Sequence, residues 1–179
     1  MHSLFIVKNI PTRLGRAVAL LSTLAVLMTL PAMAKDPETR SAIPHTLLQD
    51  LDTWLDAETE FARHDRRPRI LFVDQSHAER LHGVADRSSG RTRGLYNPET
   101  QTIYLAKPWS DADQRDISIL LHEMVHHRQS QQHYYCEQAQ EWRAYQIQAQ
   151  WLESQGLDNN FFWPAIVLQS SCTKRDIHP

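Results

Sequence analysis

Two apolar stripes with helical spacing, separated by a short break, most strongly restrict what this chain can fold into. The first stripe consists of Ile117, Leu120, Leu121, Met124 and Val125 and continues to about residue 132. Spacings of three and four residues place these side chains on one face of a helix. "HYYC" at 133–136 interrupts the pattern, and a second helix is predicted from about 137 to 155, before Gly156. The two stripes predict an antiparallel helix pair that turns near residue 134.

The segments before this pair predict one more helix and a small sheet. Residues 45–64 carry apolar side chains at helical spacing and predict an amphipathic helix. "ILFVD" at 70–74 predicts a short buried strand, and residues 95–106 predict a hairpin. Ser110, followed by two aspartates, predicts the N-cap of the first helix of the pair. The predicted fold class is therefore α+β: an N-terminal helix, a small sheet with a hairpin, then the antiparallel helix pair.

The N-terminus predicts export. Residues 1–16 contain three basic residues and no acidic residue, and an apolar run of 14 residues follows at 17–30. Ala32-Met33-Ala34 has the small-x-small form of a signal-peptidase site, so residues 1–34 are predicted to be a cleaved signal peptide. The alternative is an uncleaved membrane anchor, for which this run is short. The predicted location is periplasmic or secreted.

The remainder has the length of one domain. Cleavage after Ala34 leaves 145 residues, predicted to comprise a flexible leader at 35–44 and a single domain at 45–179. These residues contain 16 basic and 21 acidic side chains, a net charge of −5, which argues against nucleic acid or a membrane surface as partner. Cys136 and Cys172 are predicted to form a disulfide in an oxidising compartment. A thiolate metal pair or two free thiols are the alternatives.

The pattern His-Glu-Met-Val-His at 122–126 predicts a metal site on the first helix of the pair. Residues four apart are offset by only about 40°, so His122 and His126 can reach one ion from the same face. Zinc accepts imidazole nitrogen, and Glu123 can serve as the general base for a metal-activated water. His127 points about 100° away from His126, which predicts a supporting or surface position. The alternative is a surface helix that happens to carry half-exposed histidines.

The predicted helix pair also selects a third ligand, because a catalytic zinc usually has three protein ligands and a water. In an antiparallel pair that turns near residue 134, Glu141 lies beside His126. Glu137 would lie about one helical turn too close to the loop, and Glu153 far beyond the histidines. Glu141 is therefore the predicted third ligand of a Zn²⁺ site. Glu137 and His133, which lies in the break, remain the alternatives.

"HEMVH" followed by "EWRAY" resembles the gluzincin metallopeptidases, in particular small bacterial exported domains of that type. The resemblance covers about residues 95–152 and implies a minimal zincin-like fold. It also implies that His122, His126 and Glu141 are zinc ligands and that Glu123 is the general base.

The resemblance further implies that a strand at 101–105 lies beside the active-site helix and can pair with an extended peptide. Two features depart from the family pattern. The gap of 14 residues between His126 and Glu141 is shorter than in better-known gluzincins. Tyr145 stands where these proteins often have an aspartate that orients a ligand histidine. Its hydroxyl can instead donate a hydrogen bond to a tetrahedral intermediate.

Together these features predict an exported zinc-dependent peptidase or related amide hydrolase that acts on a peptide or protein. The alternative is a non-catalytic zincin-like binding or scaffold module that retains the zinc site. Glu123 favours the enzyme, because a structural zinc needs ligands but no base. A periplasmic metal-buffering protein is a third hypothesis, but it would require more clustered ligands than this chain offers.

Overall fold

The computed structural model describes residues 43–82 and 91–172. Its elements are α1 (His45–Glu58), β1 (Arg69–Val73), α2 (Gln75–His82), β2 (Gly94–Asn97), β3 (Thr102–Ala106), α3 (Gln114–Gln129), α4 (Ala139–Ser154) and α5 (Trp163–Gln169). The fold class is α+β, as predicted. The predicted signal peptide at 1–34 and residues 35–42 of the predicted leader lie outside the described residues. In the described ranges, no helix combines the length and apolar character needed to cross a membrane.

The sheet has three strands in the order β1-β3-β2, so β3 is central. β1 pairs with β3 in parallel, and β2 pairs with β3 in antiparallel register with Tyr96 opposite Ile103. The central position explains why Ile103 and Leu105 are completely buried. It also corrects one expectation, since the segment at 101–105 has a neighbour on both sides and has no edge to offer a peptide. The edge strand that contacts α3 is β2.

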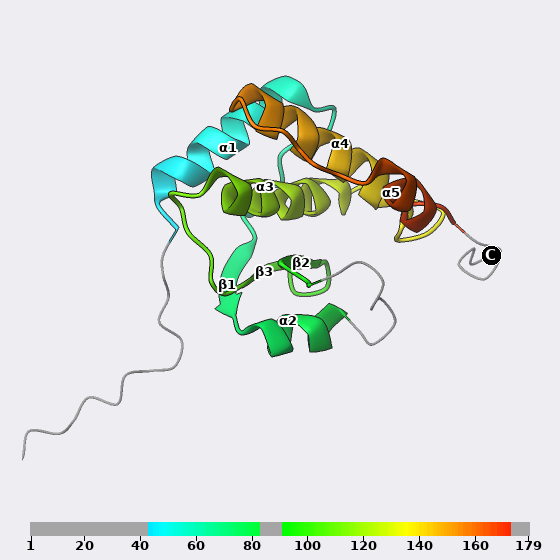
Figure 1. The fold of residues 1–179 in the computed structure, drawn as a ribbon, viewed down its shortest axis with the longest axis horizontal. Helices are drawn as coiled ribbons and strands as arrows, with labels where there is room; N and C mark the ends of the chain where they lie inside the picture. The colour runs from blue at the N-terminus through cyan, green and yellow to red at the C-terminus, as the bar shows by residue number, and fades with distance from the viewer. Residues whose placement is uncertain (1–42, 83–90, 173–179) are drawn as a thin grey trace, which may run out of the picture. The chain divides into compact units, whose positions relative to one another are not determined.

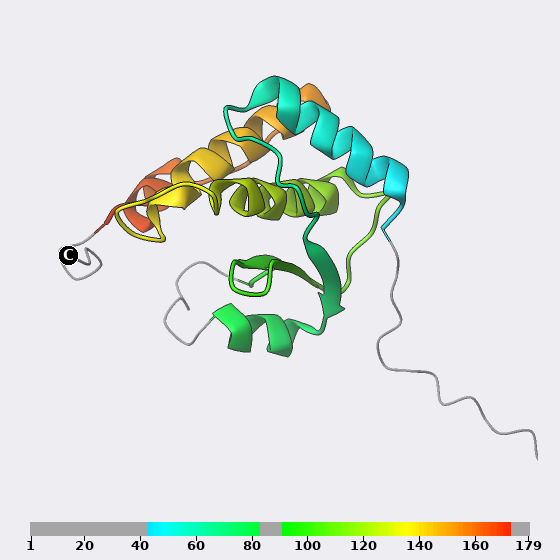
Figure 2. The same cartoon turned by 180° about the vertical axis from the view of Figure 1, so that it is seen from behind.

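Helices cover both faces of the sheet. In Figures 1 and 2, α3 lies against one face and α2 against the other, while α1 and α4 lie on the far side of α3 from the sheet. All five side chains of the predicted apolar stripe of α3 are buried. They share one core with buried side chains of α1, β3 and α4, including Leu55, Ile103 and Ile147. The helix α3 is therefore surrounded by other elements, and its apolar side chains form the middle of the hydrophobic core.

The helices α3 and α4 form the predicted antiparallel pair. Gln129 at the end of α3 contacts Gln140 at the start of α4, whereas Ser118, early in α3, contacts Gln148. The predicted N-cap of α3 is wrong by three residues. The side chain of Asp113 accepts a hydrogen bond from the backbone N–H of Arg115 at 2.8 Å and caps the helix.

A disulfide closes the domain at the end of the described chain. α5 follows α4 and returns the chain, so that Cys172 bonds Cys136 with a Cα–Cα distance of 5.8 Å. The predicted pairing of these cysteines is therefore present in the structure. Cys136 also accepts a backbone hydrogen bond from Ala139, the first residue of α4, so the bridge holds the start of this helix.

Candidate metal centre

Three potential ligands meet where α3 and α4 lie side by side. The Nε2 atoms of His122 and His126 are 3.0 Å apart. The two carboxylate oxygens of Glu141, in the first turn of α4, each lie 3.3 Å from one of these nitrogens. The three donor atoms lie within 4.8 Å of one another, the one such group of three or more His, Cys, Asp or Glu side chains in the described residues. Two imidazoles and a carboxylate are a donor set that suits zinc.

The charges of this group are coupled. Burial disfavours the charged form of His126, but the carboxylate of Glu141 and, less strongly, that of Glu123 outweigh it and raise the pKa of His126 to about 9. Burial would raise the pKa of Glu141, yet the two histidines hold it well below its ordinary value. At neutral pH the metal-free group is therefore an imidazolium beside a carboxylate. A metal ion that binds here displaces the proton on His126.

The group opens into a cleft of about 560 Å³. It is lined by residues 91–96 around β2, by residues of α3, and by residues of α4 together with Phe161. Glu123 lines this cleft next to the histidines and is only 6% exposed. A carboxylate held beside three convergent donors, and reached through a cleft of this size, is placed to exchange protons with a bound molecule.

The other candidates for the third ligand do not join the donor group. Glu137 lines the cleft but is not among the three convergent side chains. Glu153 lies near the end of α4 and accepts a hydrogen bond from Asn159 at 3.2 Å. His133 is likewise absent from the group. Of the four residues considered from the sequence, the structure brings only Glu141 to both histidines.

Tyr145 packs against one of the histidines. Its ring meets the ring of His122 edge-on, with centroids 4.6 Å apart, and meets Phe161 in the same manner at 5.3 Å. The Nδ1 atom of His122 is buried and has no hydrogen-bond partner in the described part of the chain. His122 is therefore held by ring packing, where the gluzincin pattern would lead one to expect a carboxylate.

The sequence interpretation missed two residues that contact the site. Gln129 is completely buried, and its side chain reaches Nδ1 of His126 at 2.9 Å. Its position three residues after His126, on the same helix face, was the available signal. Gly94 brings the backbone of β2 against Glu123 and Ile119, and no local pattern in the sequence marks this approach.

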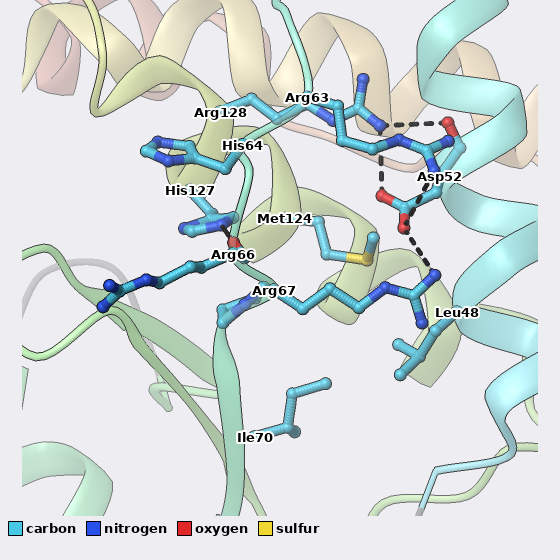
Figure 3. Close-up of a pocket in the computed structure, with 11 residues that line it drawn as sticks. Leu48, Asp52, Arg63, His64, Arg66, Arg67, Ile70, Met124, His127 and Arg128 are labelled. Carbon is cyan, nitrogen blue, oxygen red and sulfur yellow. Dashed lines mark hydrogen bonds and ion pairs between the residues drawn. The ribbon is translucent and has the colours of Figure 1, made fainter.

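His127 lies beside His64 and Arg66 in Figure 3 and is not one of the three convergent donors. It is 5% exposed, with Nδ1 at 3.0 Å from the hydroxyl of Tyr96 and Nε2 at 2.9 Å from the carbonyl oxygen of Arg66. Its ring stacks on His64, with centroids 4.3 Å apart. Burial lowers its pKa, so this histidine is neutral. The structure places it neither on the surface nor against the three donors.

Arg128 lines the same pocket as His127 and joins α3 to α1 (Figure 3). It is 3% exposed and lies 3.2 Å from a carboxylate oxygen of Asp52 and 2.8 Å from one of Asp56. It also donates to the carbonyl oxygens of Asp52 and Phe61. A buried guanidinium with several acceptors is a satisfied structural contact, so this arginine anchors α3 against α1.

Comparison with known proteins gives a family. No curated protein and no solved structure matches the chain at a significant level. A protein-family model with the description "Domain of unknown function (DUF6647)" matches residues 22–179, which is most of the chain. The chain belongs to this family, DUF6647.

Proposed function

We propose that this protein is an exported zinc-dependent peptidase or related amide hydrolase, in which His122, His126 and Glu141 hold the metal. The observation that carries the proposal is the convergence of two imidazole nitrogens and one carboxylate in a cleft that a second, buried carboxylate also lines. This second carboxylate belongs to Glu123. Three donors plus a separate base are what hydrolysis at a zinc site requires, whereas a structural site needs only ligands.

The bound metal, Glu123 and the cleft would each have a separate role in hydrolysis. When bound, zinc supplies a Lewis acid that polarises a carbonyl oxygen and makes a water molecule more acidic. The carboxylate of Glu123 accepts a proton from the attacking water and delivers it to the leaving nitrogen. The cleft brings the three donors and Glu123 to one place, where they can act on the same bond.

A peptide is the substrate that best fits the walls of the cleft. In the described residues β2 pairs with β3 alone, and its other edge is where we propose that an extended backbone pairs. Residues of β2 line the cleft beside Glu123. The cleft is also lined by the rings of Tyr145 and Phe161, which favour an apolar side chain next to the scissile bond.

The alternative is a non-catalytic module that keeps the zinc site. The observation that favours it is the unpartnered Nδ1 of His122, because ligand histidines in efficient zinc enzymes usually donate this hydrogen to a carboxylate or carbonyl. This alternative and the enzyme share the ligands and differ in the role of Glu123.

The test combines metal analysis with a peptide library. Purified protein should contain one zinc per chain, and the Glu141→Ala variant should lose it or bind it far more weakly. Cleavage of library peptides, followed by mass spectrometry, should fall by about 10²–10⁴-fold in Glu123→Gln while its zinc content stays unchanged. Zinc without any cleavage would favour the binding module, and a protein that binds no zinc would overturn both.

A further inference from the structure

Gln129 links the two helices that carry the donor group, α3 with the histidines and α4 with Glu141. It is the last residue of α3 and is completely buried. Its amide nitrogen donates to the carbonyl oxygen of Gln140 at 3.0 Å, and its amide oxygen lies 2.9 Å from Nδ1 of His126. Gln140 directly precedes Glu141. One side chain therefore contacts a candidate ligand on α3 and the backbone beside a candidate ligand on α4.

The directions of these hydrogen bonds are fixed by chemistry. The carbonyl oxygen of Gln140 can only accept, so the NH₂ group of Gln129 must face it. The oxygen of Gln129 then faces His126, which must carry a hydrogen on Nδ1 to donate. When a metal displaces the second proton of His126, the remaining hydrogen stays on Nδ1 and the lone pair is on Nε2. That atom faces His122 and Glu141.

We infer that Gln129 is a positioning residue: it selects the Nδ1–H tautomer of His126 for metal binding through Nε2, and it ties the first turn of α4 to the end of α3. The inference rests on the proposed metal site. A carboxylate or a backbone carbonyl commonly holds a ligand histidine in zinc proteins. Here a neutral amide does so, and the same amide sets the distance between the two helices that carry the ligands.

The two histidines are supported differently, which makes the role of Gln129 specific. Nδ1 of His126 is hydrogen-bonded to the amide oxygen of Gln129. Nδ1 of His122 has no hydrogen-bond partner in the described residues, and the ring of His122 packs against Tyr145. Loss of Gln129 would leave both imidazoles without an acceptor at Nδ1. The site would then lose the hydrogen bond that holds Nδ1 of His126.

Three variants test this inference. Gln129→Met removes both hydrogen bonds and keeps the length of the side chain. Gln129→Glu keeps an acceptor for Nδ1 of His126 but replaces the donor to Gln140 with an oxygen. Gln148→Met is the matched control, since Gln148 donates a buried hydrogen bond across the same helix pair to Ser118, at 3.0 Å. It lines the same cleft but is not one of the three donors.

The measurements are zinc affinity, by competition with a chelator, and urea unfolding of the metal-free proteins. We expect Gln129→Met to weaken zinc binding by about 10–100-fold. Gln129→Glu should bind zinc within about threefold of the unsubstituted protein, or more tightly, although its metal-free form unfolds at lower urea. Gln148→Met should unfold at lower urea with unchanged zinc affinity. In the zinc-loaded protein, ¹⁵N NMR should report a hydrogen on Nδ1 of His126.

The outcomes separate this inference from the proposed function. Equal zinc affinity in Gln129→Met and the unsubstituted protein would overturn the role of Gln129 and leave the metal site standing. Equal losses of affinity in Gln129→Met and Gln129→Glu would also overturn it, because they would reflect general damage to the helix pair. A protein that binds no zinc would overturn the metal site and this inference together.

Discussion

Gly94, at the start of β2, leaves the space that the carboxylate of Glu123 occupies. A Cβ atom on Gly94 would lie 2.5 Å from Oε1 of Glu123 and 2.8 Å from Cγ2 of Ile119, both well inside van der Waals contact. The glycine is therefore needed for a close approach between the strand and the helix. It brings the edge strand of the cleft directly to the proposed base.

The substitution Gly94→Ala should displace Glu123 without removing a metal ligand. We expect unchanged zinc content, a free energy of unfolding lower by about 1–3 kcal/mol from overpacking, and a fall in peptide cleavage of about 100-fold from the displaced base. Gly156→Ala is the control, since Gly156 has a positive φ of 72° but nothing within 4 Å of the added atom. Gly156→Ala should lower the free energy of unfolding and leave zinc content and peptide cleavage unchanged. Wild-type cleavage by Gly94→Ala would contradict the assigned position of the base.

Zinc affinity should depend on pH through His126. The metal needs the lone pair on Nε2, and this atom carries a proton below the pKa of about 9. Because the proton competes with the metal, the apparent Kd should fall by about tenfold for each pH unit between pH 6.5 and 8.5 and level off above the pKa. Calorimetry at pH 7.5 in buffers of different ionisation enthalpy should show about one proton released per zinc. A flat profile would exclude His126 as a ligand.

The Arg128→Ala substitution should be strongly destabilising. It removes a buried guanidinium and leaves the carbonyl oxygens of Asp52 and Phe61 without their donor, while the carboxylate of Asp52 keeps Arg67 at 3.4 Å. We therefore expect a loss of about 2–4 kcal/mol in the free energy of unfolding, measured in urea. The matched control is Arg143→Ala, because Arg143 pairs with Glu60 at 2.8 Å near the surface. That change should cost less than about 1 kcal/mol. Similar losses in the two variants would show that Arg128 is not a structural anchor.

The disulfide should support both the fold and the donor group. Replacing Cys136 and Cys172 with serine frees the segment before α4, and Glu141 lies in the first turn of that helix. We expect a loss of about 2–4 kcal/mol in the free energy of unfolding. Zinc affinity should also fall, because Glu141 must be ordered upon binding. Treatment of the unsubstituted protein with a reductant should reproduce both effects, and an unchanged zinc affinity would show that the bridge acts on stability alone.

The sequence by itself determined the features that depend on local spacing. Helical periodicity was sufficient to predict α3 and α4, because residues three and four apart share one face whatever surrounds them. The same geometry put His122 and His126 together. The predicted reversal near residue 134 then placed Glu141 level with them, since positions equidistant from the reversal lie side by side in an antiparallel pair. Their role as zinc ligands remains a prediction.

Only the tertiary structure decided the contacts between segments that are distant in sequence. The order β1-β3-β2 made β2 the edge strand, although the hairpin alone left either strand free to pair with β1. The burial of His127 depends on His64 and Arg66, which arrive from a different part of the chain. The approach of Gly94 to Glu123 depends on how the sheet packs against α3. Such contacts follow from long-range packing, which periodicity in a single segment does not encode.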